Sequence, residues 1–239
     1  DQGRNPSLLL GILKTGAPPA TLGAFGGYPA MFRDLLGADT FTYRTFDVEA
    51  GELPDRANAC PAYIVTGSAC GAYDPLPWIA DLKRLLNAAR AEAALVGICF
   101  GHQIMAEAFG GTVAPSPKGW GVGAHSYEVC QPPTWITRAE RFTLPASHQD
   151  QVVALPPGAT IAAGSSFAPY GALTYTGSRA ISLQLHPEFT PAYAAALADL
   201  RRGHGLTDAE ADHAIASLRQ PMDNALAAQW ITRFVQGAG

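Results

Sequence analysis

The sequence predicts an α/β fold of three layers, in which an open, mostly parallel sheet lies between helices and carries an added antiparallel hairpin region. Up to residue 109, short apolar runs alternate with segments of helical spacing. That alternation is the pattern of βαβ units and a parallel sheet. After Gly110, short strand-like segments are separated by proline and glycine turns, which is typical of strands that pair as hairpins. Residues 190–239 return to helical spacing and are expected to form C-terminal helices.

The parallel part of the sheet is predicted from the first half of the chain. Three continuous apolar runs are typical of strands covered on both faces, and one alternating segment is rich in aromatic and β-branched residues. The predicted strands are residues 7–14, 40–47, 62–66 and 94–98. The predicted helices are residues 29–36, 78–92 and 100–109.

The second half is predicted to hold short strands and then helices. The strands are expected at residues 122–129, 142–146, 151–155, 160–163, 173–175 and 180–185. The helices are expected at residues 191–202, 207–218 and 224–235, the second opened by a capping box of Thr207 and Glu210. Because no repeat or long linker divides the chain, we expect residues 1–239 to form one domain. The polar start, about residues 1–6, is expected to be disordered or artificially added.

Composition and charge argue against several classes of function. Hydrophobic residues make up 48% and charged residues 15% of the 239 residues, which is a globular composition. The formal net charge of −4 and the lack of a long basic run argue against a nucleic-acid partner. No apolar run is long enough to span a membrane, and no segment has the flanks of a signal peptide. We therefore expect no membrane partner. Four widely spaced cysteines favour free thiols in a reducing compartment, so we expect a cytoplasmic location.

The strongest chemical signal is the pentapeptide Gly97-Ile98-Cys99-Phe100-Gly101, between a predicted buried strand and a predicted helix. A nucleophile at a sharp strand-to-helix turn needs small residues two positions to either side, because bulk there would clash as the chain folds back. The helix N-terminus that follows favours the thiolate of Cys99. A lone cysteine is more often a buried apolar residue, but this context favours a nucleophile.

The second signal is His186-Pro187-Glu188, after the predicted strand at residues 180–185. A cysteine nucleophile needs a base, and the base needs an orienting partner. A histidine at the carboxyl end of a strand lies on the sheet edge where α/β folds bind ligands. Glu188 is close enough in sequence to fix the tautomer of the imidazole. Without Cys99, the same triplet would indicate only a histidine beside a turn.

Together, residues 97–103 (GICFGHQ) and the later His186-Pro-Glu188 resemble the two motifs of the class I, triad-type glutamine amidotransferases. The resemblance extends from about Ser7 to Phe189. It implies a flavodoxin-like sheet, with Cys99 as nucleophile, His186 as general base and acid, and Glu188 as the residue that orients His186. It also implies that Gln103 lines the glutamine pocket.

Two further segments match the same family. Thr66-Gly67-Ser68 follows the third predicted strand, where the family has a glycine-rich turn that donates a backbone N–H to the oxyanion. Gly67 or Ser68 would donate here, together with the N–H of Phe100, and the sequence does not choose between the two. Ser147, His148, Gln149 and Asp150 match a segment whose backbone holds the amino-acid end of glutamine. Ordinary turn chemistry accounts for each segment about equally well on its own.

The remaining motifs indicate no metal and no cofactor. Cys99 and His102 have metal-like spacing, but no second pair completes four ligands. The glycine-rich segment 119–123 does not follow a buried strand and open a helix, so it is better explained as the approach to a hairpin. The family resemblance implies that this segment lies near the pocket mouth. The other histidines and cysteines considered, which we expect to be non-catalytic, are His125, His204, His213, Cys60, Cys70 and Cys130.

We therefore expect a small-molecule substrate, glutamine or a γ-glutamyl compound, whose γ-amide is cleaved through a γ-glutamyl thioester on Cys99. One use of this chemistry is a glutaminase that passes ammonia to a separate synthase subunit. The alternative is a stand-alone γ-glutamyl peptidase or hydrolase acting on small γ-glutamyl amides. A third interpretation is a non-catalytic binding or redox-sensing module, against which the intact triad and Gln103 argue.

Overall fold

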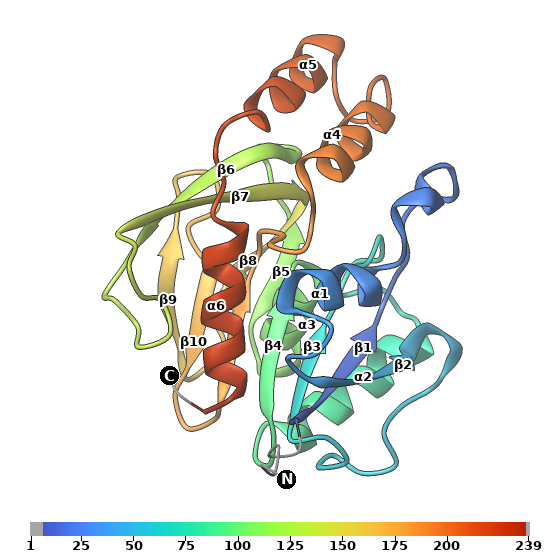
Figure 1. Ribbon diagram of the computed structural model, residues 1–239, viewed down its shortest axis with the longest axis vertical. Helices are drawn as coiled ribbons and strands as arrows, with labels where there is room; N and C mark the ends of the chain where they lie inside the picture. Colours follow the sequence, from blue (N-terminus) through green and yellow to red (C-terminus); the bar gives the residue numbers. More distant parts are fainter. Residues whose placement is uncertain (1–6, 238–239) are drawn as a thin grey trace, which may run out of the picture.

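The computed structural model describes residues 7–237, and the expectation for residues 1–6 lies outside this range (Figure 1). Its main sheet has nine strands in the order β2-β1-β3-β4-β11-β10-β9-β6-β7. A separate two-stranded sheet pairs β5 with β8. The predicted fold class, a mostly parallel sheet flanked by helices with an antiparallel addition, is confirmed.

The parallel part of the sheet comes almost entirely from the first half of the chain. Its strands are β1 (Leu9–Lys14), β2 (Thr42–Asp47), β3 (Ala62–Val65), β4 (Ala94–Ile98) and β11 (Ala180–Leu183). β11 inserts beside β4 and runs parallel to it, with Ser182 opposite Gly97. This pairing brings the segment after residue 183 to the same sheet edge as the segment after residue 98.

The antiparallel part differs in detail from the expected series of hairpins. Its strands are β5 (Thr112–Pro115), β6 (Gly121–Val129), β7 (Arg141–His148), β8 (Asp150–Ala154), β9 (Ala159–Gly164) and β10 (Ala172–Tyr175). β8 leaves the main sheet and pairs with β5, a strand that the sequence analysis missed. β5 has only four residues and ends in proline, so it is too short to show a clear alternation. The strand predicted for residues 180–185 ends earlier, at Leu183.

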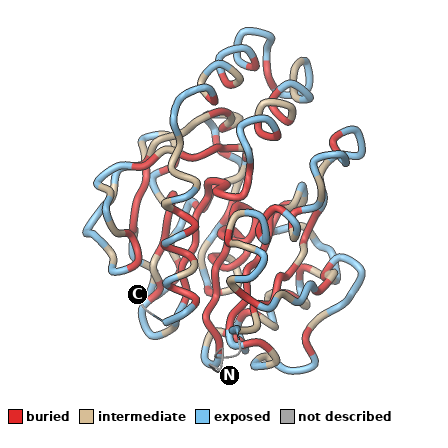
Figure 2. Tube along the Cα trace, viewed as in Figure 1, coloured by how far each residue is buried: buried red, intermediate tan, exposed pale blue. Residues whose placement is uncertain are grey.

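Helices cover both faces of the sheet. α1 (Tyr28–Leu36) and α6 (Asn224–Val235) share one buried cluster, which includes Phe32 and Trp230. α2 (Pro77–Ala89) and α3 (Phe100–Ala108) share a second cluster on the other face, which includes Leu82 and Ile104. Figure 2 shows the central strands buried between these helices. Two 3₁₀ helices, η1 (Ala20–Phe25) and η2 (Val48–Ala50), interrupt the connections after β1 and β2.

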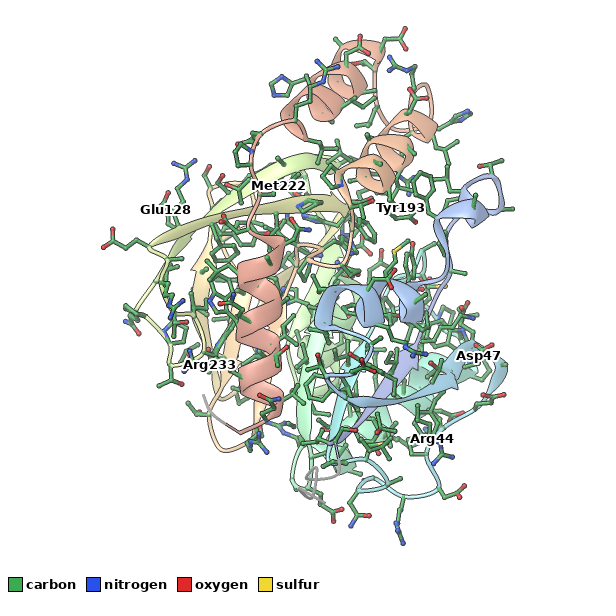
Figure 3. All side chains as sticks on the ribbon, in the orientation of Figure 1. Arg44, Asp47, Glu128, Tyr193, Met222 and Arg233 are labelled. Atoms are coloured by element: carbon green, nitrogen blue, oxygen red, sulfur yellow. The ribbon has the colours of Figure 1, made fainter. Side chains whose placement is uncertain are left out.

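The helices α4 (Pro191–Leu200) and α5 (Asp208–Ser217) extend beyond one end of the sheet, above β6 and β7 (Figure 1). The predicted capping box of Thr207 and Glu210 opens α5. Tyr193 of α4, labelled in Figure 3, is buried where this helix meets the rest of the molecule. No helix between residues 7 and 237 combines the length and apolar character needed to cross a membrane.

Candidate active site

Cys99 occupies a sharp turn between β4 and α3. Its backbone has φ 54° and ψ −105°, a region that residues other than glycine rarely adopt. A side chain on Gly97 would place its Cβ 2.5 Å from the carbonyl oxygen of Gly101. A side chain on Gly101 would place its Cβ 2.3 Å from the carbonyl oxygen of Val65. The steric need for small residues on both sides of Cys99 is therefore present in the structure.

His186 and Glu188 meet beside this turn. The Nδ1 atom of His186 lies 3.2 Å and 3.1 Å from the two carboxylate oxygens of Glu188. Both residues are buried, with 3% and 5% of their surface exposed. His186 and Cys99 line the same cleft, which has a volume of about 570 Å³. The structure thus brings together the three residues that the sequence analysis singled out as a triad.

The electrostatics of the cleft favour a charged imidazole at His186 only. Burial by itself would lower the pKa of His186, but the charges of Cys99 and Glu188 and hydrogen bonds to them outweigh burial and raise this pKa to about 10. Burial lowers the pKa of His148 and of His102 to about 3. Burial also lowers the pKa of His125. At neutral pH, His186 can therefore hold a proton while these three imidazoles stay neutral.

The His186 imidazole and the backbone that follows it are held by residues that the sequence analysis missed. The ring of Phe189 stacks on it, with centroids 3.8 Å apart and an interplanar angle of 6°. The side-chain amide of Asn224 donates to the carbonyl oxygens of Pro187 and Phe189, both at 2.9 Å. Phe189 directly follows the His-Pro-Glu triplet and was within reach of sequence reasoning. Asn224 is distant in sequence and carries no local signal.

A chain of two glutamines reaches the sulfur of Cys99. Gln184 Nε2 lies 3.5 Å from Cys99 Sγ, and Gln184 Oε1 accepts a hydrogen bond of 3.2 Å from Gln103. Gln103 also donates to the carbonyl oxygen of Asp150 at 2.9 Å and lines the cleft, as expected. Gln184 was missed, although a polar residue at the end of an apolar strand was a usable signal.

The turn predicted to bind the oxyanion lies against His186. Gly67 and Ser68 both line the cleft, and a Cβ on Gly67 would sit 3.3 Å from His186 Cε1. Phe100 is the first residue of α3, so its N–H has no partner within the helix. Buried Thr15, which the sequence analysis missed, fixes the turn by donating to the carbonyl oxygens of Thr66 (2.9 Å) and Gly67 (3.1 Å).

The segment predicted to hold the amino-acid end of glutamine lines the cleft throughout, with Ser147, His148, Gln149 and Asp150 all on its wall. The carbonyl oxygen of Ser147 lies 3.8 Å from Cys99 Sγ. Burial raises the pKa of Asp150, and the neighbouring charge of Asp74 adds to this effect. The structure therefore brings the predicted site residues to the cleft, except Phe100, which lies beside Cys99, and Glu188, which lies behind the cleft wall against His186. Their roles stay predictions.

The motifs set aside on sequence grounds lie as follows. His102 points to β11, where its Nδ1 is 2.6 Å from Ser182 Oγ, and it is absent from the cleft lining. Within residues 7–237, no group of three or more His, Cys, Asp or Glu side chains is arranged to hold a metal ion. Trp120 of the glycine-rich segment lines the cleft, as expected for a residue near the pocket mouth. Cys70, expected to be non-catalytic, also lines the cleft.

Comparison with known proteins finds similar chains and folds. The chain is 30% identical to γ-glutamyl peptidase 5 of Arabidopsis thaliana over 70% of this chain and 69% of that protein. It is 33% identical to a glutamine-hydrolysing GMP synthase of Thermomicrobium roseum over 52% of this chain, but this match spans only 23% of the synthase. A glutamine amidotransferase of Thermotoga maritima has the same fold, with a TM-score of 0.78 and 18% identity over 95% of this chain and 98% of that one.

The model of the family described as glutamine amidotransferase class-I matches residues 49–197. This match covers more than half of the chain and includes the turn at Gly67, the turn at Cys99 and the His186–Glu188 pair. Family membership supports a glutamine amidotransferase or hydrolase activity. The chain therefore belongs to the class I glutamine amidotransferase family.

Proposed function

We propose that this chain is a cysteine amidohydrolase that cleaves the γ-amide of glutamine or of a γ-glutamyl compound with a Cys99–His186–Glu188 triad. The observation that carries the proposal is the position of Cys99 and His186 on one cleft, with Glu188 bonded to the far side of the imidazole. A nucleophile, a base and an orienting carboxylate in this order are the components of covalent acyl transfer.

In the proposed mechanism, the Cys99 thiolate attacks the γ-carbonyl carbon, and its oxygen becomes an oxyanion. The backbone N–H of Phe100 and one from the turn at Gly67 or Ser68 hold that oxyanion, each contributing on the order of 3 kcal/mol to lowering the barrier. Protonated His186 gives its proton to the departing nitrogen, so the C–N bond breaks and a γ-glutamyl thioester stays on Cys99. His186 then takes a proton from water, which releases glutamate and restores the thiolate.

The test is a panel of γ-glutamyl amides, including glutamine, assayed for release of ammonia or amine. Adding hydroxylamine supplies a nucleophile that competes with water for the thioester, so γ-glutamyl hydroxamate is expected among the products. Cys99→Ala is expected to abolish both products while leaving the thermal unfolding temperature near the wild-type value. Hydrolysis of the same amide by Cys99→Ala at the wild-type rate would contradict the proposal.

A second candidate, a glutaminase that works with a separate synthase subunit, is favoured by the match to the glutamine-hydrolysing GMP synthase. The same panel separates the two. Strong cleavage of γ-glutamyl conjugates by the isolated chain supports the peptidase, whereas cleavage of glutamine alone supports the glutaminase. A Cys99 thiol that reacts with a glutamine-like electrophile no faster than free cysteine would instead support the non-catalytic module.

A further inference from the structure

The cleft that holds Cys99 also contains an arginine that the proposed mechanism does not use. Arg201 follows the last residue of α4, and its guanidinium lies over the indole of Trp120, 3.6 Å from the ring centroid. Both side chains line the cleft together with Cys99 and His186. A guanidinium stacked on an aromatic face lies parallel to the ring, so its N–H groups point outward in that plane. In this position they can donate to both oxygens of a planar anion such as a carboxylate.

Arg201 lacks the partners that its neighbour has. Among the residues described, no carboxylate comes within ion-pair distance of Arg201, and its buried Nε has no hydrogen-bond partner. Arg202, the next residue, pairs instead with three carboxylates, those of Asp199, Asp208 and Asp212. Arg201 is half-buried, and this burial lowers the pKa of its guanidinium. An unpaired, partly desolvated cation gains from binding an anion.

The backbone around Arg201 is held rigidly. Its carbonyl oxygen accepts hydrogen bonds from the N–H groups of His204 (2.8 Å) and Leu206 (3.1 Å), which closes a tight turn between α4 and α5. Gly205 in this turn has φ 114°, and a Cβ there would lie 2.7 Å from Trp120 Nε1. Only glycine leaves room for the indole at this distance. The turn thus fixes both the cation and the ring below it.

Charge is divided between two parts of the cleft. Its carboxylates are Asp74 and Asp150, and Asp150 is joined through its carbonyl oxygen to Gln103. Among the described residues that line the cleft, Arg201 is the only one that is a lysine or an arginine. Tyr28, a neighbour of Arg201 on the cleft wall, has its ring stacked on Phe189 and thus lies on the imidazole side of the site. The imidazole side is where the departing nitrogen receives its proton in the proposed mechanism.

We propose that Arg201, supported by Trp120, binds a carboxylate on the amine half of the substrate. This inference rests on the proposed function and narrows it. The preferred substrates are γ-glutamyl amino acids or γ-glutamyl peptides, whose leaving group carries a carboxylate, over glutamine and γ-glutamyl alkylamides, whose leaving groups carry none. Arg201 is a specificity-determining residue in this scheme and takes no part in proton transfer.

The test compares γ-glutamylalanine with its C-terminal amide, which differs only in the charge of the leaving group. Wild-type protein is expected to prefer the acid. In Arg201→Gln, the ratio of kcat/KM for the acid over kcat/KM for the amide is expected to fall roughly 10- to 100-fold, chiefly through KM, because a charge-assisted bond is lost. Arg201→Lys keeps the charge but not the stacked fork and should give an intermediate ratio. Arg202→Gln, the matched control, should leave the ratio at the wild-type value.

Three results would overturn the inference. One is an equal loss on both substrates in Arg201→Gln, which would place the bound carboxylate on the glutamyl half. Another is a value of kcat/KM that stays at the wild-type level on both substrates in this variant. A third is wild-type protein that cleaves glutamine but neither γ-glutamylalanine nor its amide. This result would contradict the inference about Arg201 but would still support the proposed cleavage of a γ-amide. Wild-type protein that cleaves no γ-glutamyl amide would remove the proposed function and the inference together.

Discussion

At the scale of single residues, the site depends on how Cys99 and Glu188 act on one imidazole. Cys99 is the larger of the two charges that raise the pKa of His186, and burial acts in the opposite direction. The raised pKa of His186 therefore depends on these two partners. This balance can be measured directly, without a substrate.

The first prediction concerns the protonation of His186 in Cys99→Ala. Losing the sulfur removes the main cause that raises this pKa, so it is expected to fall from about 10 toward or below the ordinary value of about 6.5. NMR titration of the imidazole should show wild-type His186 protonated from about pH 5 to pH 8, whereas the variant loses the proton within or below that range. Identical titration curves would show that the sulfur does not act on the imidazole.

The second prediction concerns Glu188→Gln. An amide in place of the carboxylate removes the charge that holds and stabilises the imidazolium, so kcat is expected to fall roughly 10²- to 10⁴-fold with a smaller change in KM. Glu140→Gln, at an exposed position, is the matched control and should behave as wild type. Steady-state kinetics on the best substrate of the panel provide the measurement. A kcat within about twofold of wild type would remove Glu188 from the triad.

At the scale of elements, the turn between β4 and α3 determines where the nucleophile lies. Glycine inside a helix normally destabilises the helix by about 1 kcal/mol relative to alanine, so helix propensity alone would favour alanine at position 101. Packing favours glycine instead, because the Cβ of an alanine at position 101 would lie 2.3 Å from the carbonyl oxygen of Val65 on β3. Overpacking of this kind typically costs about 1–3 kcal/mol, and a backbone atom cannot move aside as a side chain can.

The third prediction is therefore that Gly101→Ala lowers the free energy of unfolding by about 1–3 kcal/mol. Gly23→Ala, in η1, is the matched control because a Cβ there meets no atom within 4 Å. The control is expected to change stability by less than about 0.5 kcal/mol. Chemical denaturation of both variants provides the comparison. A stabilised Gly101→Ala would mean that helix propensity, and not the contact with β3, decides this position.

Local patterns in the sequence were enough to locate most elements and the two segments that carry the triad. β4 and α6 occur at the predicted residues because apolar runs, helical spacing and turn residues agree there. β5 was missed because four residues ending in proline show no period. The strand at β8 was predicted, but its pairing with β5 in a separate sheet was not, because register and partner depend on contacts across the chain, which a local pattern does not contain.

The supporting residues of the site were harder to predict, because each acts from a distant element. Thr15 lies after β1, Gln184 after β11 and Asn224 at the start of α6, and only the folded chain brings them to the turns at Gly67, Cys99 and His186. Ser182 and Gln184 were missed as well, although polar residues alternating in an apolar strand are a local sign of specific buried partners. The same reasoning from pattern did not reveal Arg201, whose role depends on stacking against Trp120.

At the scale of the whole molecule, buried neutral histidines make stability depend on pH. Burial lowers the pKa of His102 to about 3, while an unfolded histidine has a pKa of about 6.5. A lowered pKa in the folded state means that the contribution of neutral His102 is fully present above about pH 6.5. It is lost as the pH falls toward 3, because only the unfolded chain takes up the proton.

The fourth prediction is that His102→Gln weakens the acid sensitivity of the fold. Between about pH 6 and pH 4, each such histidine adds about 1.4 kcal/mol per pH unit to the slope of unfolding free energy against pH. The slope is expected to be smaller by this amount in His102→Gln than in wild type, even if the variant is less stable at neutral pH. His204→Gln, at an exposed position, is the control and should keep the wild-type slope. Equal slopes in wild type and His102→Gln would contradict a buried neutral imidazole at position 102.

The central claim is that the sulfur of Cys99 becomes acylated during turnover. The most direct measurement is mass spectrometry of protein quenched in acid within the first turnovers on a good γ-glutamyl substrate, followed by peptide mapping. We predict a mass increase of one γ-glutamyl group on the peptide that contains Cys99, which disappears on adding hydroxylamine and is absent from Cys99→Ala. Turnover with the acyl group on another residue, or at the wild-type rate in Cys99→Ala, would contradict the account.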